Sequence, residues 1–249
     1  MIRIEYTDVY GFDTAIRGMR NPMNSWDKSD SVHYYGTGDP CAGCPLDSKV
    51  CAMEVYPLNG WCFKLGDNDL ALMRKLARAG DDHGKFARFI NVTVDITAPL
   101  YWWKEFDTYK VGTVANSCST MHKIADKEFT LEDFSHEHLL DAANNDAGDA
   151  LFLNDKDNIR VDGDDLLGLT INVLNYYRGR YIKTKDKRYW WQLIQLLPSS
   201  YNQKRTVQLN YQVLNRIYLA RKYHKLDEWR GFCNWIESLP YFKEIYLDN

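Results

Sequence analysis

Apolar and polar residues alternate most regularly between residues 90 and 97. Ile90, Val92, Val94 and Ile96 alternate there with Asn91, Thr93, Asp95 and Thr97. Successive side chains of a strand point to opposite faces of its sheet, so this period of two predicts a strand with one buried face. A shorter alternation over Ile2–Tyr6 predicts a strand near the start of the sequence.

Several other segments carry apolar residues at helical spacing. They cover residues 69–79, 131–143, 166–180, about 209–222 and about 226–239. Asn68 or Asp69 can cap the first of these helices, and Gly80 can end it. Pro99 fits the first turn of a further helix reaching about Tyr109, because its missing N–H costs nothing there. Strands interspersed with helices predict a mixed α/β fold.

Composition and charge narrow the class of protein. The chain has 249 residues, of which 45% are hydrophobic, enough to bury the core of one large domain or of two small ones. The formal net charge of −3 argues against a broad surface for polymeric nucleic acid. Apolar runs stay short of the ~18 residues that span a bilayer, and the start of the sequence lacks the apolar run of a signal peptide. We therefore expect a soluble, cytoplasmic protein without a membrane partner.

Four of the six cysteines lie close together. They are Cys41, Cys44, Cys51 and Cys62. Without a secretion signal, such clustering favours zinc or an iron-sulfur cluster over disulfides, and the Cys41-x2-Cys44 spacing suits one tetrahedral ion. The spacing of Cys51 and Cys62 does not match a standard zinc ribbon, and His33 competes as a fourth ligand. The alternative is an insertion at about residues 33–64 whose thiols have no metal, since its glycines and prolines mark a loop.

Residues 99–122 are the best candidate for a ligand site. An aromatic half containing Trp102, Trp103 and Phe106 could seat a flat ligand, and it runs into a polar half with Lys110 at the junction. A buried helix followed by a capped loop would give the same pattern. Cys118 and Ser119 are weak nucleophiles without a neighbouring base, so we expect binding and orientation rather than covalent catalysis.

The order of motifs resembles the flavin-dependent thymidylate synthases. Residues 82–106 read Asp82-His83-x-x-Phe86, a strand, Ala98-Pro99-Leu100-Tyr101 and Lys104-Glu105-Phe106, followed by the polar segment. The last third reads Leu197-Pro198-x-x-Tyr201, Asn210, Leu214-Asn215, Leu219-Ala220-Arg221 and His224-x-x-x-Glu228-x-Arg230. Both series follow the family's elements in order, over about residues 65–125 and 190–235.

This resemblance implies a fold, ligands and an assembly. The fold is a single α/β (α+β) domain over residues 1–249, with a central, mostly antiparallel sheet flanked by long helices. The family assembles as a homotetramer with active sites between subunits. Its members methylate dUMP using FAD, methylenetetrahydrofolate and NADPH, and the flavin carries the redox chemistry. A related pyrimidine deoxynucleotide is the other substrate that we consider.

The resemblance also implies roles for individual residues. His83, Lys110, Thr113 and Asn116 would contact the cofactor. Ser119 takes the place of the substrate-facing serine if one residue is inserted, and Cys118 takes it otherwise. Arg221 matches the arginine that contacts the pyrimidine, so Ser119 and Arg221 are the candidate catalytic residues. Arg205, with Lys204, could replace missing phosphate contacts, although an exposed basic pair would read the same way.

Several departures from the family pattern fall on charged positions. Thr108-Tyr109-Lys110 stands where the family has R-H-R, which removes two guanidinium groups suited to bidentate phosphate binding. A non-catalytic relative that keeps the nucleotide-binding fold is therefore one alternative. A metal or iron-sulfur protein built on the cysteine cluster is the other.

Overall fold

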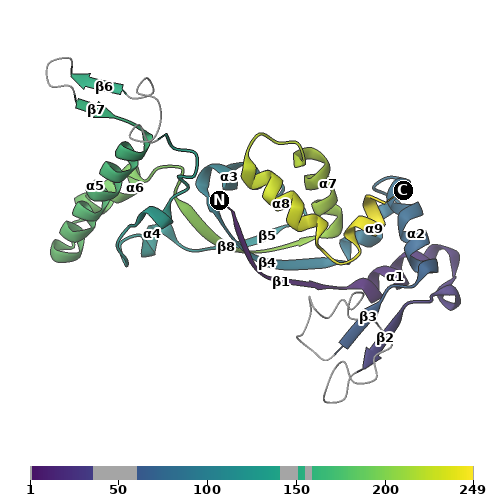
Figure 1. Ribbon diagram of the computed structural model, residues 1–249. Coiled ribbons are helices and arrows are strands. Elements are labelled where there is room, and N and C mark those ends of the chain that lie inside the picture. The colour runs from purple at the N-terminus through teal and green to yellow at the C-terminus, as the bar shows by residue number, and fades with distance from the viewer. Residues whose placement is uncertain (1, 36–60, 141–150, 155–158, 249) are drawn as a thin grey trace. The chain divides into compact units, whose positions relative to one another are not determined.

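A computed structural model describes residues 2–35, 61–140, 151–154 and 159–248 (Figure 1). The chain divides into two compact units. Unit 1 comprises Met1–Arg3, Thr97–Phe106 and Ser117–Arg205. Unit 2 comprises Ile4–Ile96, Asp107–Asn116 and Thr206–Asn249. Within the described ranges we find no helix with both the length and the hydropathy of a membrane span.

Four strands form an antiparallel sheet in the order β1-β4-β8-β5. Their bounds are β1 (Arg3–Tyr10), β4 (Asn91–Pro99), β8 (Asn202–Asn210) and β5 (Val114–Ser117). In β4 the side chains of Val92, Val94 and Ile96 are buried, while those of the intervening residues are half-buried. This confirms the strand predicted from alternation and the mixed α/β fold with a mostly antiparallel sheet. The opening strand is also confirmed, and it continues beyond Tyr6 to Tyr10.

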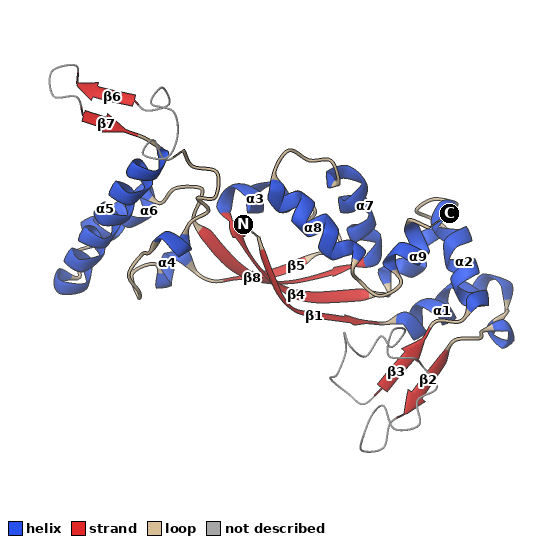
Figure 2. Cartoon of the chain, viewed as in Figure 1, coloured by secondary structure: helices blue, strands red, loops and turns tan. Residues whose placement is uncertain are grey.

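Unit 2 packs helices around an aromatic core. Its elements besides the strands of the main sheet are α1 (Phe12–Arg20), η1 (Asn21–Met23), η2 (Trp26–Lys28), β2 (Val32–Tyr35), β3 (Trp61–Lys64), α2 (Asp67–Arg78), η4 (Gly84–Arg88), α7 (Tyr211–Arg221), α8 (Asp227–Glu237) and α9 (Phe242–Tyr246). Figure 2 shows α7 and α8 side by side on one face of the strands of this unit. Trp235 of α8 donates a hydrogen bond to the Thr7 hydroxyl of β1 at 3.0 Å. The helices predicted at about 209–222 and 226–239 are confirmed.

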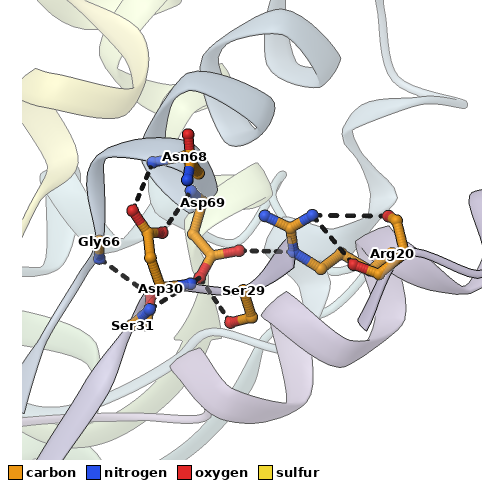
Figure 3. A network of polar contacts seen from close by, with 8 residues as sticks. Arg20, Ser29, Asp30, Ser31, Gly66, Asn68 and Asp69 are labelled. Carbon is orange, nitrogen blue, oxygen red and sulfur yellow. Dashed lines mark hydrogen bonds and ion pairs between the residues drawn. The ribbon is translucent and has the colours of Figure 1, made fainter. Parts of the chain in front are cut away.

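A buried ion pair joins α1 to α2 in unit 2 (Figure 3). The Arg20 Nε lies 2.6 Å from Asp69 Oδ1, and both side chains are almost fully buried. The hydroxyls of Ser29 and Ser31 each donate to Asp69 Oδ2 at 2.7 Å. Both oxygens of the Asp69 carboxylate therefore accept hydrogen bonds, which a buried carboxylate needs.

This network corrects the predicted start of α2. The helix begins after Gly66, and neither Asn68 nor Asp69 caps it with its side chain. Asp30, from the preceding loop, accepts hydrogen bonds from the backbone N–H groups of Asn68 and Asp69 at 2.9 and 3.1 Å. A carboxylate distant in sequence thus performs the capping that we assigned to a local residue.

Unit 1 has a separate small core. Its elements are α3 (Leu100–Phe106), α4 (Thr120–Lys123), η5 (Leu131–Asp133), β6 (Leu151–Asn154), β7 (Ile159–Val161), α5 (Gly163–Thr184) and α6 (Lys187–Leu196), together with the strand ends that fall in this unit. The buried residues of the core are Ile124, Phe129, Phe134, Leu167, Leu174 and Leu193. The helix predicted at 166–180 is confirmed as part of α5.

Two predicted helices of unit 1 need correction. The helix predicted over 131–143 is wrong, because among residues 131–140 only Leu131–Asp133 form a helical turn. Asp133 closes a capping box with Thr130, and Phe134 leaves that turn in an extended conformation to enter the core. Pro99 ends β4 rather than starting a helix, and α3 stops at Phe106 instead of Tyr109.

Candidate functional site

Unit 1 contains a cavity of about 440 Å³ where the ends of β4 and β8 meet the polar segment after β5. Thr97 lies near the end of β4, Tyr201 immediately precedes β8, and Asn202 is the first residue of β8. Cys118 and Ser119 follow β5 and also line this cavity. Its volume falls within the roughly 300–1,000 Å³ that is typical of small-molecule sites.

Backbone hydrogen bonds fix the segment that carries Cys118 and Ser119. The Cys118 N–H donates to the Lys204 carbonyl at 2.9 Å, and Gln203 Nε2 donates to the Cys118 carbonyl at 2.9 Å. The Ser119 hydroxyl then caps α4 by accepting from the His122 N–H at 3.1 Å. Cys118 is exposed and Ser119 is half-buried. Both alternative positions for the substrate-facing side chain therefore belong to the same cavity.

Two buried oxygen atoms of the cavity residues have no hydrogen-bond partner among the described parts of the chain. They are Thr97 Oγ1 and Asn202 Oδ1. The other end of the Asn202 amide donates to the Glu132 carbonyl at 3.4 Å. A buried polar group left unpaired costs about 1–3 kcal/mol, so a polar ligand that bonded to these oxygens would recover part of that cost.

The charges around the cavity are largely paired within the chain. Lys123 lies 2.9 Å from Asp126, and Lys127 forms an ion pair with Asp133. Arg3 and Lys204 add two more positive side chains to the lining. Burial, followed by electrostatic interactions with Asp133 and Cys118, raises the pKa of Tyr201. Tyr201 therefore keeps its proton at neutral pH and can donate a hydrogen bond.

Arg205 is held against an aromatic ring in unit 1. Its guanidinium carbon lies 4.2 Å from the ring centre of Trp103, and its Nε donates to Gln203 Oε1 at 3.0 Å. The Trp103 indole donates in turn to the Gln203 carbonyl at 2.9 Å. Since Gln203 also lines the cavity, this stack fixes a positive charge beside a cavity residue.

The aromatic half of residues 99–122 belongs to the core rather than to a ligand platform. Trp102, Trp103 and Phe106 are at most 2% exposed. Their rings pack on one another, with centroids 4.9 to 5.3 Å apart. The structure thus agrees with the alternative interpretation, a buried helix followed by a capped loop, which correspond to α3 and the start of α4.

Unit 2 holds Arg221 in an aromatic environment. Its Nε donates to the Tyr109 hydroxyl at 2.9 Å, and its guanidinium carbon lies 4.7 Å from the Trp229 ring centre. Tyr109 and Trp229 also contact each other, with ring centroids 6.1 Å apart. Tyr109, at the position of the family histidine, therefore helps to position the predicted pyrimidine-contacting arginine.

The predicted cofactor residues all lie in unit 2. His83, Lys110 and Asn116 are exposed. Thr113 is half-buried, and its hydroxyl oxygen is buried without a hydrogen-bond partner in the described structure. In unit 1, Ser119 and Cys118 therefore line one cavity, and Gln203 links that cavity to Arg205. Arg221 lies in unit 2, as do the candidate cofactor residues.

The predicted metal ligands lie mainly outside the described residues. This applies to Cys41, Cys44 and Cys51. Cys62 lies in β3, where its backbone is paired with that of Tyr34. The parts of the chain that the structure describes contain no group of three or more metal-binding side chains.

The sequence analysis missed most residues of the cavity, among them Thr97, Asn202 and Arg3. Thr97 was predicted only as part of the polar face of a strand, Asn202 was not singled out, and Arg3 lies in the opening strand. Besides Cys118 and Ser119, Tyr201 had a signal as part of the Leu197-Pro198-x-x-Tyr201 motif, and Lys204 was named together with Arg205. Residues 97 and 202 are brought together by the pairing of β4 with β8, which no local pattern specifies.

Comparison with solved structures shows a clear likeness. A crystal structure of thymidylate synthase X (ThyX) from Helicobacter pylori with FAD and dUMP matches 98% of this chain and 96% of its own, with a TM-score of 0.59 and 14% sequence identity. The UMP/dUMP methylase PolB from Streptomyces cacaoi, bound with 5-Br UMP, matches 98% of this chain and 93% of its own, with a TM-score of 0.55 and 16% identity. The same methylase with 5-Br dUMP gives a TM-score of 0.56 at 16% identity, over 98% of this chain and 94% of its own.

These comparisons confirm the fold that the sequence resemblance implies, that of the flavin-dependent thymidylate synthases. No model of a protein family and no curated protein matches the sequence. At 14 to 16% identity the likeness establishes the fold, and activity has to be argued from the site.

Proposed function

We propose that this chain is a diverged flavin-dependent thymidylate-synthase-like enzyme that methylates a pyrimidine nucleotide. The structural neighbours with this fold are a thymidylate synthase with FAD and dUMP and a UMP/dUMP methylase. The proposal depends on one observation, that Ser119, assigned to the substrate-facing position from the sequence, lines a ligand-sized cavity. Cys118 lines it as well, so the assignment does not depend on where the one-residue insertion falls.

The chemistry of the cavity suits one nucleotide better than an apolar ligand. Thr97 and Asn202 offer buried oxygens that need partners, and the Tyr201 phenol can donate to a ring carbonyl or a phosphate. Arg3 and Lys204 offer positive charge. In this proposal Ser119 contacts the pyrimidine, and Arg205, held on Trp103, supports the phosphate end.

The residues that would hold FAD lie just before β5 and within it. Lys110 and Asn116 are exposed to bind it, and the buried Thr113 hydroxyl has no hydrogen-bond partner among the described residues. Lys110 supplies one point charge for a phosphate where the family has a bidentate arginine. Bound FAD would supply the redox chemistry, with NADPH as reductant and methylenetetrahydrofolate as one-carbon donor, as the resemblance implies. The protein would orient the rings and exclude water.

The assembly and location also follow from the resemblance. We propose a homo-oligomer with the family's tetramer as its expected form, acting in the cytoplasm. Arg221, beside Tyr109, would contact the pyrimidine in the assembled enzyme. Metal binding by the cysteine cluster is independent of this proposal and stays a prediction from sequence.

The proposal is tested by spectroscopy and turnover on the purified full chain. We expect flavin absorbance after FAD is added and unbound FAD is removed. We also expect tritium release from carbon 5 of labelled dUMP or UMP when methylenetetrahydrofolate and NADPH are present. Absence of both flavin binding and nucleotide binding would overturn the proposal.

A non-catalytic relative would give a different pattern. It would be stabilised against heat by nucleotide, by about 2.7 kcal/mol when the nucleotide is at 100 times its dissociation constant, but it would release no tritium. The missing guanidinium groups of residues 108–110 are the feature that favours this alternative.

A further inference from the structure

Positive charge is concentrated in unit 1 where α5 ends and α6 begins. Residues 178–191 contain six lysines and arginines and one aspartate, a net charge of +5, whereas the whole chain carries −3. The remaining residues therefore carry −8. Such segregation of charge is typical of a surface that binds an anionic partner. The acidic total argues against a broad basic surface, but it does not exclude a small one.

Two of these six cations have partners within the chain. Arg178 donates to the carbonyls of Ala125 and Asp126 at 3.0 and 3.2 Å. Arg188 forms an ion pair with Asp186 at 2.7 Å. The other four are exposed and form no ion pair with any of the described residues; they are Arg180, Lys183, Lys185 and Lys187. These four can bind an external anion without first breaking an ion pair within the described structure.

Aromatic rings lie between these cations. The guanidinium carbon of Arg180 lies 5.0 Å from the ring centre of Tyr189, and Tyr189 stacks on Tyr177 with 6.3 Å between ring centres. The Lys187 ammonium lies 5.6 Å from the ring centre of Trp191, which is 43% exposed. Because α5 and α6 pack side by side (Figure 1), these contacts form one surface of cations and rings. We define the basic-aromatic patch as the exposed residues of this surface, Tyr176, Arg180, Lys183, Lys185, Lys187 and Trp191.

Exposed rings beside unpaired cations favour single-stranded nucleic acid among anionic partners. A single strand presents base faces that stack on aromatic rings and phosphates that bind lysine and arginine, whereas a duplex hides its base faces. A membrane surface would instead require one continuous apolar stripe along a helix. Tyr189, Trp190 and Trp191 are consecutive, so their side chains point in different directions around α6, and Trp190 packs against the core of unit 1.

We propose that the basic-aromatic patch binds single-stranded RNA or DNA, with phosphates on its cations and a base stacked on Trp191. Aromatic rings stack on any base and cations bind any phosphate, so binding should depend on salt far more than on base sequence. All residues of the patch belong to unit 1. The patch can bind a strand whether or not the chain has the activity proposed above.

Fluorescence anisotropy of the full chain with labelled oligouridylate and oligothymidylate of about 12 nucleotides tests for binding. We expect a Kd of about 10 μM at about 50 mM salt, and a slope of log K against log salt of about −2 to −3, as three or four phosphate contacts give. Millimolar UMP should leave binding unchanged, because the mononucleotide occupies the cavity lined by Ser119 instead. Absence of binding to both oligomers, or loss of binding in UMP, would overturn the proposal.

Alanine in place of an exposed ring tests the stacking. Trp191→Ala should weaken binding about tenfold at constant salt, because it removes one stacked base. Tyr223→Ala is the matched control, since Tyr223 in unit 2 is 89% exposed and the Lys222 ammonium lies 5.0 Å from its ring centre. Circular dichroism should be unchanged in both variants. Equal affinity in wild type and Trp191→Ala, or an equal loss in Tyr223→Ala, would contradict the stacked base.

Charge reversal tests the phosphate contacts. The double variant Lys183→Glu with Lys187→Glu should bind more weakly and make the salt slope shallower by about 1.4, the value for two lost contacts with a single strand. Lys222→Glu in unit 2 should change neither quantity. An unchanged slope in the double variant would contradict the proposed contacts. Co-sedimentation with vesicles of phosphatidylcholine and phosphatidylserine, without binding of either oligomer, would overturn the proposal in favour of a membrane surface.

Discussion

The Ser119 hydroxyl has a structural bond in addition to its proposed contact with a nucleotide. It accepts a hydrogen bond from the His122 N–H and so begins α4. Ser119→Ala should therefore lower the free energy of unfolding by about 1 kcal/mol and weaken dUMP binding by about tenfold. Calorimetric titration with dUMP and urea unfolding measure the two effects separately.

Ser119→Thr is the matched control for this prediction, because it keeps a hydroxyl that can cap the helix. It should retain stability and most of the affinity. Equal dUMP affinity in wild type and Ser119→Ala would remove Ser119 from the binding site.

Asp69 gives unit 2 a dependence on pH. Burial opposes its charge, but hydrogen bonds from Ser31, Ser29 and Arg20, with the charge of Arg20, outweigh burial and lower its pKa below the ordinary value of 3.8. A carboxylate with a depressed pKa contributes stability above its unfolded pKa and loses it as the pH falls through the folded one. We expect the protein to lose stability steeply below about pH 4.

Asp69→Asn should remove this dependence and leave Arg20 buried without its counter-ion. At pH 7 the expected loss of unfolding free energy is about 3–5 kcal/mol. The Asp227–Arg230 ion pair is the control, since both side chains are 51% exposed and Asp227→Asn should cost less than about 1 kcal/mol. Urea unfolding between pH 7 and pH 3 makes the comparison. If the free energy of unfolding depended on pH in the same way in wild type and in Asp69→Asn, the role assigned to Asp69 would be contradicted.

At the scale of elements, the turn before β5 depends on a glycine next to α7. Gly112 has a φ of +78°, and an added Cβ would lie 3.0 Å from Asn210 Nδ2. The Asn210 side chain caps α7 by accepting from the Val213 N–H at 3.1 Å. Gly112→Ala should therefore destabilise the protein by about 1–3 kcal/mol, through backbone strain and a displaced cap.

Gly168→Ala should instead raise the free energy of unfolding. Gly168 lies inside α5, and a Cβ there would have no atom within 4 Å. Alanine in a helix interior is about 0.5–1 kcal/mol more favourable than glycine. Urea unfolding of the two variants measures both effects. A change of the same sign in the unfolding free energy of both variants would contradict these two predictions.

Elements with strong periodicity could be predicted from sequence, whereas their ends could not. The alternation in β4 and the apolar spacing of α5, α7 and α8 were sufficient, because burial on one face determines both pattern and structure. The segment after Leu131 has helical spacing too, yet Phe134 leaves the first turn to fill the core of unit 1. The cap of α2 comes from Asp30, which is distant in sequence, so local rules missed it.

At the scale of the whole molecule, only part of the candidate site could be predicted from sequence. Cys118 and Ser119 lie in one polar segment that a motif can describe. Thr97 and Asn202 join them only because β4 and β8 are paired in the sheet. The resemblance supplied the fold because the order of many weak motifs is preserved, even though the phosphate-directed charges of residues 108–110 are not.

Our central claim is that a pyrimidine nucleotide binds in the cavity lined by Cys118 and Ser119, and alkylation of Cys118 tests it most directly. Cys118 is an exposed free thiol, and Cys233 is buried, with its pKa raised by burial to about 11, so it serves as an unreactive internal control. Iodoacetamide labelling of the full chain, followed by mass spectrometry, gives the rate at each cysteine. We predict that saturating dUMP or UMP slows labelling of Cys118 at least about tenfold by covering the thiol. An unchanged labelling rate of Cys118 in the presence of either nucleotide would contradict the claim.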